Sequence, residues 1–316
     1  MNIWRLQTKT ASNDHSKIAD YCLENNIIAI GWSLKTENLD EKSIQEREKI
    51  TTFEEYTEFI ETHNFYGRKL NPNVKRFYYD IKPNDLVWIR SNGVYYLGRV
   101  TENSKWIFNT SKIANDKDAA NQITNIEWYR IGEESCVPGA IAISLIRGMT
   151  IQRINKTGVS KFSQHLFNQK SDKKIYKDTS IDDSFKTFYN LLSTEDCEDL
   201  LCLWLYSKYG YITIPSTNKK STECYECILK DPKSGRCIYP QVKTSDDLEK
   251  KNFNHLNGEV WLFTVNGKVI DDSNNSYDNI HVANPHILYE FVETEEASKI
   301  LPESILNWYK SLAELK

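Results

Sequence analysis

The sequence has no long apolar run and few cysteines. No stretch approaches the ~20 consecutive apolar residues that span a membrane, and the start, Met1-Asn-Ile-Trp-Arg5, lacks the charged and apolar regions of a signal peptide. Cysteine occurs seven times in 316 residues, and an odd number cannot complete a disulfide framework. These absences exclude a membrane-spanning protein and a disulfide-stapled secreted one, and they predict a cytoplasmic protein.

The sequence also lacks an excess of positive charge. Its 40 Lys and Arg are outnumbered by 44 Asp and Glu, so the overall charge does not favour non-specific nucleic-acid binding. Positive charge gathers locally, because residues 65–79 contain no acid, five aromatics and Arg68, Lys69, Lys75 and Arg76. Basic residues interleaved with aromatics predict contact with a DNA backbone. The alternative is an ordinary solvated surface.

The length of the chain predicts two domains. Its 316 residues are 40% hydrophobic and 12% aromatic, enough for two cores. Between them, residues 147–174 carry seven Lys or Arg against one acid, a composition typical of a polar connection. We therefore predict an N-terminal domain over 1–150, a basic linker over 151–184 and a C-terminal domain over 185–316.

A capped helix opens the C-terminal domain. Residues 193–209 begin with Ser193, which is followed three residues later by Asp196, and they end before Gly210. A hydroxyl cap with an acid three residues on, and a glycine at the end, are typical of a complete helix. The helix carries Glu198 in its first half.

A hairpin follows this helix. Residues 223–231 and 236–243 are rich in Tyr, Ile, Val and Cys, which favours two strands, and residues 232–235 supply the turn. We predict that the polar stretch after the hairpin is helical and that residues 259–266 form a further strand.

Polar side chains of the hairpin share one face. Because strand side chains alternate, Gln241 and Lys243 point to one side and Val242 points to the other. A carboxylate on the neighbouring strand, most plausibly Glu226 and otherwise Glu223, then lies close to both. An acid, an amide oxygen and an amine at one place suit Mg²⁺-dependent cleavage of a phosphodiester. The alternative is that these are solvent-facing strand residues.

This arrangement resembles the PD-(D/E)xK nucleases, in the Gln-x-Lys variant of the Mrr-like restriction endonucleases. The resemblance implies a restriction-endonuclease-like α/β sandwich that binds Mg²⁺. The chain departs from the family in using Glu for the usual Asp, and Pro240 removes a backbone donor, which a strand tolerates only at an edge or bulge. The resemblance implies that the catalytic residues are Glu226, Gln241, Lys243 and Glu198, and that the metal ligands are Glu226, the Gln241 side-chain oxygen and the Val242 carbonyl.

The N-terminal domain shows a different pattern. An early strand contains Trp4, a buried strand runs over 27–32, and residues 82–88 lead into a hairpin with an Asn92-Gly93 turn. The pattern resembles the EVE and YTH group of PUA-like domains. This resemblance implies a mixed β-barrel with helices, so the predicted fold class of the whole chain is α/β (α+β).

Members of that group hold a modified base in an aromatic pocket. A flipped base needs flat apolar walls. The alternative is that the aromatic side chains fill the core, as most do in a small barrel. The candidates for the modified-base pocket are Trp32, Tyr66, Trp88 and Trp106, with Asn64 as a partner for a base edge.

Together the two resemblances predict a type IV, modification-dependent restriction endonuclease. Its N-terminal domain would flip a modified base of double-stranded DNA into the pocket, and its C-terminal domain would hydrolyse the DNA with Mg²⁺, in defence against phage. Cleavage of both strands needs two active sites, which predicts a possible homodimer. No membrane partner is predicted. Two alternatives remain, a non-catalytic reader of modified nucleic acid and a nuclease effector gated by a nucleotide signal.

Overall fold

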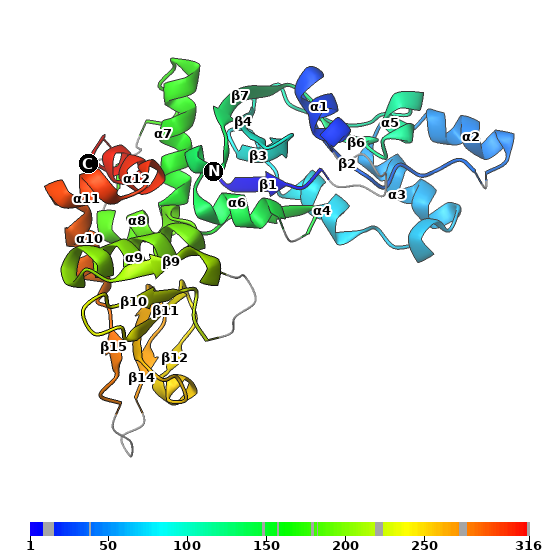
Figure 1. The fold of residues 1–316 in the computed structure, drawn as a ribbon. Coiled ribbons are helices and arrows are strands. Elements are labelled where there is room, and N and C mark those ends of the chain that lie inside the picture. Colours follow the sequence, from blue (N-terminus) through cyan, green and yellow to red (C-terminus); the bar gives the residue numbers. More distant parts are fainter. Residues whose placement is uncertain are drawn as a thin grey trace. The chain divides into compact units, whose positions relative to one another are not determined.

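The structure is a computed structural model of the chain (Figure 1). It divides into two compact units, Met1–Thr179 and Ser180–Lys316, each of which mixes helices and strands. The α/β class predicted from the sequence is therefore confirmed. The residues described are 1–8, 16–37, 39–146, 149–156, 158–177, 180–181, 183–218, 224–271 and 277–314.

The first unit contains two open sheets. The larger has five strands in the order β7-β4-β3-β1-β8, all antiparallel except β1 and β3, which are parallel. The smaller has the antiparallel order β2-β6-β5. The described strands do not close into a barrel, which differs from the PUA-like expectation. Their bounds are β1 (Ile3–Leu6), β2 (Ile28–Ile30), β3 (Leu86–Ser91), β4 (Val94–Val100), β5 (Trp106–Phe108), β6 (Asn121–Ile123), β7 (Ile126–Gly132) and β8 (Ile151–Arg153).

Short helices surround these sheets. The side chain of Thr52 accepts from the Glu55 backbone, and the Glu55 carboxylate accepts from the Thr52 backbone, so a reciprocal cap begins α3. The helices of this unit are α1 (Ser16–Glu24), α2 (Glu41–Glu48), α3 (Phe53–Thr62), α4 (Pro72–Tyr79), α5 (Lys112–Asp116), α6 (Gly139–Ile146) and α7 (Val159–Ser171), with the 3₁₀ turns η1 (Phe65–Gly67) and η2 (Glu134–Cys136).

The linker predicted over 151–184 is largely folded into the first unit. Residues 151–153 form β8, which pairs with β1, and residues 159–171 form α7. The α7 side chain of Ser163 accepts from Trp88 Nε1 at 3.2 Å, and the Phe167 ring packs edge-on against Tyr129. The prediction was wrong because this segment, besides its positive charge, has apolar residues at helical spacing. Helix α7 buries these residues.

A buried carboxylate fixes the parallel pairing of β1 and β3. Asp85, which immediately precedes β3, is 1% exposed and accepts from the Asn2 backbone at 2.7 Å and from Trp4 Nε1 at 2.8 Å. The Lys82 backbone also donates to it at 3.1 Å. One side chain thus joins the start of the chain to a segment about 80 residues later in the sequence.

The second unit is built on one mixed sheet. Its strand order is β15-β13-β11-β10-β9, in which β9, β10 and β11 are antiparallel and β11, β13 and β15 are parallel. Strands β12 and β14 form a separate two-stranded sheet. The strands are β9 (Ile212–Ile214), β10 (Ile228–Lys230), β11 (Cys237–Lys243), β12 (Leu248–Glu249), β13 (Glu259–Thr264), β14 (Val269–Ile270) and β15 (Ile280–Val282).

The helices of the second unit include one that was predicted and lack another. Helix α9 has the reciprocal cap of Ser193 and Asp196 and ends at Gly210 in the left-handed conformation, as the sequence predicted. The helix expected after β11 is absent, because residues 244–258 form β12 and a 3₁₀ turn around the buried side chains of Leu248 and Phe253. The helices and turns are α8 (Ser184–Leu191), α9 (Thr194–Tyr209), η3 (Pro215–Thr217), η4 (Lys250–Phe253), α10 (Pro285–Val292), α11 (Glu295–Ile300) and α12 (Glu303–Glu314).

No helix within the described ranges is both long enough and apolar enough to cross a membrane.

We expect Asp85→Ala to lower the free energy of unfolding by about 2 kcal/mol or more, since it leaves the buried N–H of Trp4 and the partly buried N–H of Asn2 without an acceptor. Urea unfolding measures the change. The control is Asp80→Ala, which removes an exposed acid at the end of α4 and should stay within about 0.5 kcal/mol of the unmodified protein. Equal losses in both variants would contradict this role of Asp85.

Candidate functional site

The predicted site in the second unit forms where one side of β11 loses its partner. The regular pairing of β10 with β11 ends at Leu229 opposite Ile238. Beyond it, the Glu226 backbone N–H donates to the Pro240 carbonyl at 2.9 Å, one residue out of that register. Proline has no N–H to return this bond. On its other side β11 stays paired with β13 through Lys243, so Pro240 occupies an irregular edge as expected.

The Glu226 carboxylate occupies this irregular edge. Its Oε1 accepts from Gln241 Nε2 at 2.7 Å and from the Val242 backbone N–H at 3.3 Å. The Val242 carbonyl faces the same side and lies 3.4 Å from Gln241 Nε2, while the Val242 side chain is buried. The structure therefore brings together the acid, the amide and the backbone carbonyl that the sequence predicted. Glu223 lies outside the described residues.

The side chain of Gln241 has an unused acceptor. Gln241 is 2% exposed, and its buried Oε1 has no hydrogen-bond partner in the described part of the chain. Buried amide oxygens normally have a partner, so this oxygen suits a cation. No group of three or more His, Cys, Asp or Glu side chains within the described ranges is placed to hold a metal ion. A metal here would depend on the amide and a backbone carbonyl as well as on Glu226.

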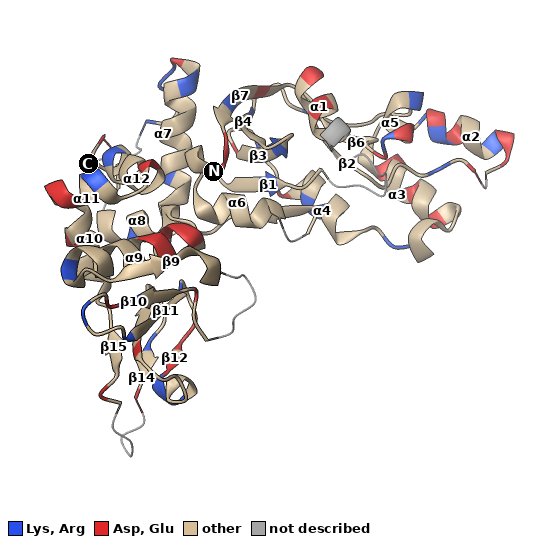
Figure 2. Cartoon of the chain, in the orientation of Figure 1, with Lys and Arg blue, Asp and Glu red and all other residues tan. Residues whose placement is uncertain are grey.

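Helix α9 adds a second acid to this site. Burial, together with the nearby charge of Glu226, raises the pKa of Glu198 to about 7, while Lys243 opposes the shift. These charges place Glu198, Glu226 and Lys243 near one another, and Gln241 joins them through its hydrogen bond to Glu226. Figure 2 shows the acidic residues gathered at one end of α9. The site holds a carboxyl that carries a proton for much of the time near neutral pH, as well as a carboxylate and an amine.

Two thiols pack α9 against the hairpin. Cys202, one turn after Glu198, and Cys227, next to Glu226, place their Sγ atoms 3.7 Å apart. This is a non-bonded contact, since a disulfide is about 2.05 Å long, and none of the seven cysteines, all of which are described, is in a disulfide. The contact holds the two acidic residues on facing elements.

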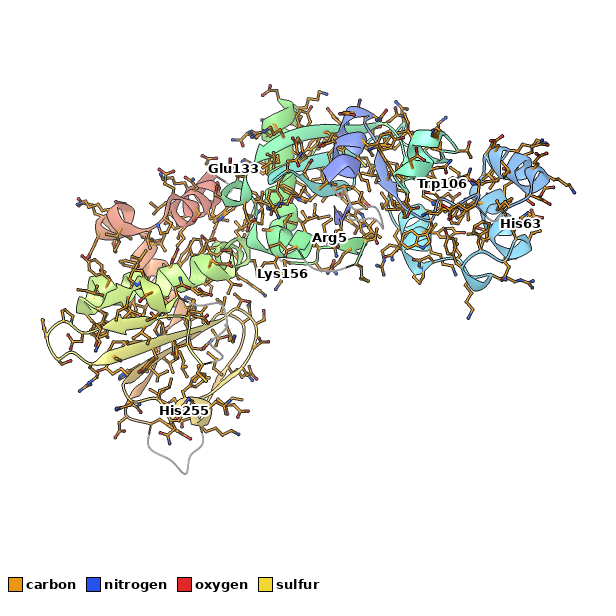
Figure 3. All side chains as sticks on the ribbon, turned by 45° about the vertical axis from the view of Figure 1, so that its right-hand side comes forward. Arg5, His63, Trp106, Glu133, Lys156 and His255 are labelled. Carbon is orange, nitrogen blue, oxygen red and sulfur yellow. The ribbon has the colours of Figure 1, made fainter. Side chains whose placement is uncertain are left out.

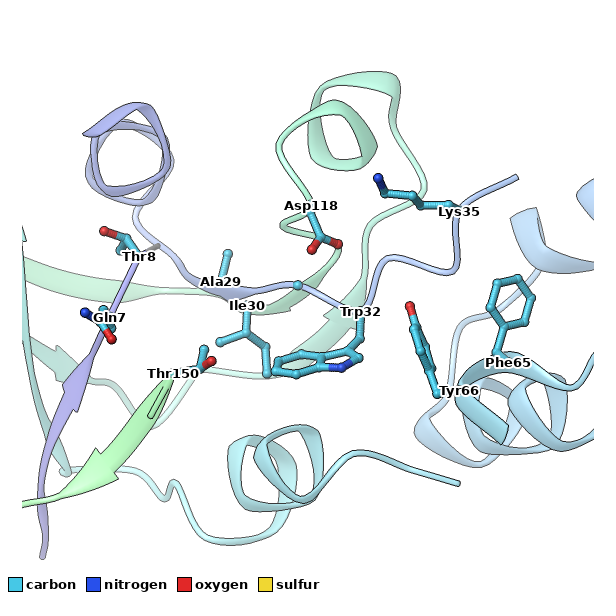
Figure 4. A pocket seen from close by; sticks show the side chains of 11 residues that line it. Gln7, Thr8, Ala29, Ile30, Trp32, Lys35, Phe65, Tyr66, Asp118 and Thr150 are labelled. Carbon is cyan, nitrogen blue, oxygen red and sulfur yellow. The ribbon is translucent and has the colours of Figure 1, made fainter. Parts of the chain in front are cut away.

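The first unit contains a separate pocket. It encloses about 430 Å³ and is lined by aromatic and polar side chains that include Trp32, Phe65 and Tyr66 (Figure 4). Tyr66 is 46% exposed, whereas Trp32 is half-buried. The pocket also contains Asp118 and Lys35, which the sequence did not single out because neither belongs to a recognisable motif. Two of the five residues predicted for a base pocket therefore line it.

The other three predicted pocket residues lie elsewhere. Trp88 is 0% exposed and is a core residue of β3. Trp106 packs edge-on against Phe53 and Tyr78, with ring centroids 5.3 and 5.7 Å away, inside a dense group of side chains (Figure 3). Asn64 is exposed just before η1 and does not line the pocket. Large aromatics on strands filled the core here, as the alternative interpretation held.

The loop that carries Trp32 is held in an unusual conformation. Trp32 and Leu34 have positive φ angles of 60° and 51°, which are unfavourable for side chains of this size. The Trp32 carbonyl accepts from the Tyr56 hydroxyl at 2.9 Å. Arg47, which is 1% exposed, donates through Nε to the Leu34 carbonyl at 2.7 Å. Buried side chains therefore impose this loop, and such imposed strain is typical of functional sites. Further bonds join the Gly31 carbonyl to Asn121 Nδ2 and the Ser33 carbonyl to Arg47.

The four basic residues predicted to contact DNA lie on or near η1 and α4. Arg68 and Lys69 follow Tyr66 closely and are exposed, and Figure 2 shows this basic segment between η1 and α4. Lys75 on α4 is also exposed. Arg76 is half-buried and donates to the Ile151 carbonyl at 3.2 Å, so at least part of its role is structural.

Comparison with known families gave one match. Residues 4–154 match a model described as a domain of unknown function (DUF8426), which runs from β1 to the end of β8. No EVE domain and no Mrr-like nuclease domain was found. No curated protein and no solved structure matched the chain significantly. The matching family has no described activity, so the match assigns no role to either unit.

The raised pKa of Glu198 predicts a pH-dependent stability. Between its ordinary value of 4.5 and about 7, the folded state holds a proton that the unfolded chain releases, so stability falls as pH rises through this window. We expect Glu198→Gln to show a smaller drop in melting temperature than the unmodified protein between about pH 5 and about pH 8.

Circular dichroism at several pH values measures this drop. The control is Glu296→Gln, which changes an exposed acid on α11 and should leave the pH dependence unchanged. If Glu198→Gln falls as steeply as the unmodified protein, Glu198 is ionised in the folded state and the site carries no such proton.

Proposed function

We propose that the protein is a modification-dependent DNA endonuclease, in which the first unit recognises a modified base and the second unit hydrolyses the DNA. The observation that carries the proposal is the grouping of Glu198, Glu226, Gln241 and Lys243, together with a buried Gln241 amide oxygen that has no partner in the described residues. The resemblance to Mrr-like PD-(D/E)xK nucleases supports the same assignment, because it involves these same positions.

The donor set at this site fits a hard cation. Glu226, the Gln241 side-chain oxygen and the Val242 carbonyl are oxygen ligands of the kind that Mg²⁺ takes. When bound, Mg²⁺ supplies polarisation of a phosphate and a lowered pKa of a bound water. The Gln241 amide presents Nε2 to Glu226, so ligation by both residues requires the amide to turn over. Gln241 then places its oxygen beside a carboxylate, which only a cation makes favourable.

The remaining side chains of the site neutralise charge and transfer protons. Lys243 Nζ holds or orients the attacking water, or neutralises the charge that develops on the phosphate. Glu198, whose pKa of about 7 lies near working pH, holds a proton that it can exchange with a neighbouring water. Both acids and the lysine thus act on the same small volume.

The pocket of the first unit supplies the proposed recognition of DNA. Trp32 and Tyr66 offer flat walls for a base that leaves the duplex, and exposed Arg68, Lys69 and Lys75 can contact the DNA backbone. The proposed partner is double-stranded DNA with a modified base. A cytoplasmic location, a role in defence against phage, and a homodimer that cuts both strands complete the proposal.

We expect Lys243→Ala to abolish DNA cleavage while the fold stays intact by circular dichroism. The assay uses Mg²⁺ and a panel of duplexes that are plain or carry methylcytosine, hydroxymethylcytosine, its glucosylated form or methyladenine. The unmodified protein should cut one modified duplex and spare the plain one. The reason is that Lys243 is the only cationic side chain predicted for the catalytic site.

The matched control is Lys233→Ala, in the exposed turn of the same hairpin, which should cleave at the unmodified rate. An unchanged rate in Lys243→Ala would overturn the nuclease assignment. Binding of a modified duplex without any cleavage would favour the non-catalytic reader. Cleavage of plain DNA only after a small nucleotide is added would favour the signal-gated effector.

Mg²⁺ should bind weakly without DNA, with a Kd of ~1 mM or higher, because the site has an amide where a second carboxylate would add charge. Isothermal titration calorimetry measures this. Gln241→Glu should lower the Kd by about tenfold, since affinity follows the charge of the ligands. Micromolar affinity in the unmodified protein would contradict this account of the site.

A further inference from the structure

We propose that the pocket of the first unit takes a base with an exocyclic amino group, of the cytosine or adenine type, and that Asp118 recognises this amino group. The proposal rests on the proposed function of the first unit as a reader of modified DNA. It goes further by naming the class of base and the residue that selects it.

Asp118 is held at the pocket by contacts with the loop that carries Trp32. Its Oδ1 accepts from the Ser33 backbone N–H at 3.1 Å. A Cβ added at Gly31 would lie only 2.5 Å from Oδ2, so the carboxylate occupies the space that any other side chain at Gly31 would need. Figure 4 shows Asp118 directed toward the backbone between Ile30 and Trp32, within the pocket. A hydrogen bond and the absence of a side chain at Gly31 therefore place the acid in the lining of the pocket, on the other side of this backbone from the Trp32 ring in that view.

The second oxygen of Asp118 is available to a ligand. Within the described residues, Oδ2 has no hydrogen-bond donor, and the side chain is only half-buried. The backbone around it is fixed, because Asn121 holds the Gly31 carbonyl and Tyr56 holds the Trp32 carbonyl. A rigid acceptor in the lining of a pocket that also has aromatic walls suits a planar ligand.

The chemistry of a carboxylate selects the ligand. An ionised Asp only accepts hydrogen bonds. Cytosine and adenine present an amino group at the position where thymine, uracil and guanine present a carbonyl oxygen, and acidic side chains pair with such amino groups. A carbonyl oxygen at Oδ2 would meet a second acceptor with no proton between them. The pocket should therefore discriminate by this edge, whichever modification the base carries.

Lys35 has a different part in the same pocket. It is exposed and lies on the same side as Asp118 in Figure 4. A flipped base remains attached to its phosphates, and an exposed ammonium suits one of them as a point charge. A phosphate contact strengthens binding to all sequences alike and depends on salt, whereas Asp118 should change only the ranking of bases.

The test compares two bases that differ at the edge that Asp118 would contact. 5-Hydroxymethylcytosine and 5-hydroxymethyluracil carry the same modification, but one has an amino group and the other a carbonyl. Duplexes with either base, and with 5-methylcytosine, glucosylated hydroxymethylcytosine or N6-methyladenine, are titrated with the full chain by fluorescence anisotropy without Mg²⁺. We expect an amino-bearing base to bind at least about tenfold more tightly than hydroxymethyluracil.

Asp118→Asn gives the decisive variant. Its side-chain oxygen can keep the bond to the Ser33 N–H, which leaves an amide NH₂ in place of the free acceptor. We expect this variant to lose or invert the preference for the amino-bearing base. Gly31→Ala, whose methyl group would displace the carboxylate, should weaken the same preference with Asp118 unchanged. The control Asp116→Asn alters an exposed acid of α5 and should keep the original ranking.

Lys35→Ala separates charge from base selection. It should weaken all duplexes by a similar factor and lower the slope of log K against log salt by about one, without changing their ranking.

Each result decides between the claims. Equal binding of the amino and carbonyl bases, or an unchanged ranking in Asp118→Asn, overturns the role of Asp118 and leaves the reader function standing. If no modified duplex binds, the reader function and this inference both fail. If modified DNA binds with the expected ranking but is never cut when Mg²⁺ is added, this inference holds and only the nuclease assignment fails.

Discussion

The absence of one backbone N–H shapes the candidate catalytic site. Pro240 accepts a hydrogen bond from the Glu226 backbone but cannot return one, so the β10–β11 ladder stops and the chain before β10 leaves its register. The gap admits the Glu226 carboxylate, which takes the backbone donor of Val242 and the amide of Gln241. A regular ladder would have satisfied the Val242 N–H with a carbonyl and left no place for the acid. The end of the β10–β11 pairing is thus what makes room for the residues of the candidate site.

In the first unit the candidate binding residues are positioned by added hydrogen bonds, not by the lack of one. There, additional hydrogen bonds from buried side chains hold a loop that has no regular partner. Arg47 and Asn121 bond successive carbonyls of residues 31–34, and in doing so they hold Trp32 and Leu34 at φ angles that their side chains disfavour. A buried guanidinium must be fully bonded to be tolerated, so the loop and Arg47 depend on each other. The wall of the pocket is consequently part of the folded core.

Local patterns allowed part of this structure to be predicted. The cap at Ser193 and the alternation that places Gln241 apart from Val242 depend on residues close in sequence, and the structure has both. The prediction of a helix after β11 was wrong, because the few apolar residues of that stretch are buried by partners that composition does not reveal. Trp88 was mistaken for a pocket residue because the type of side chain does not tell core from cavity. Asp118 was missed because its contacts are with residues about 85 positions away.

The two thiols between α9 and the hairpin act as a spacer. Their sulfur atoms touch at 3.7 Å, and each lies within one helical turn or one residue of an acid of the site. The contact of these two sulfur atoms therefore helps to set how closely the elements that carry Glu198 and Glu226 approach each other. A bulkier side chain at either position would push the helix off the strands and widen the distance between the carboxyl groups. The spacing of the two acids of the candidate site is thus influenced by two residues that do not belong to it.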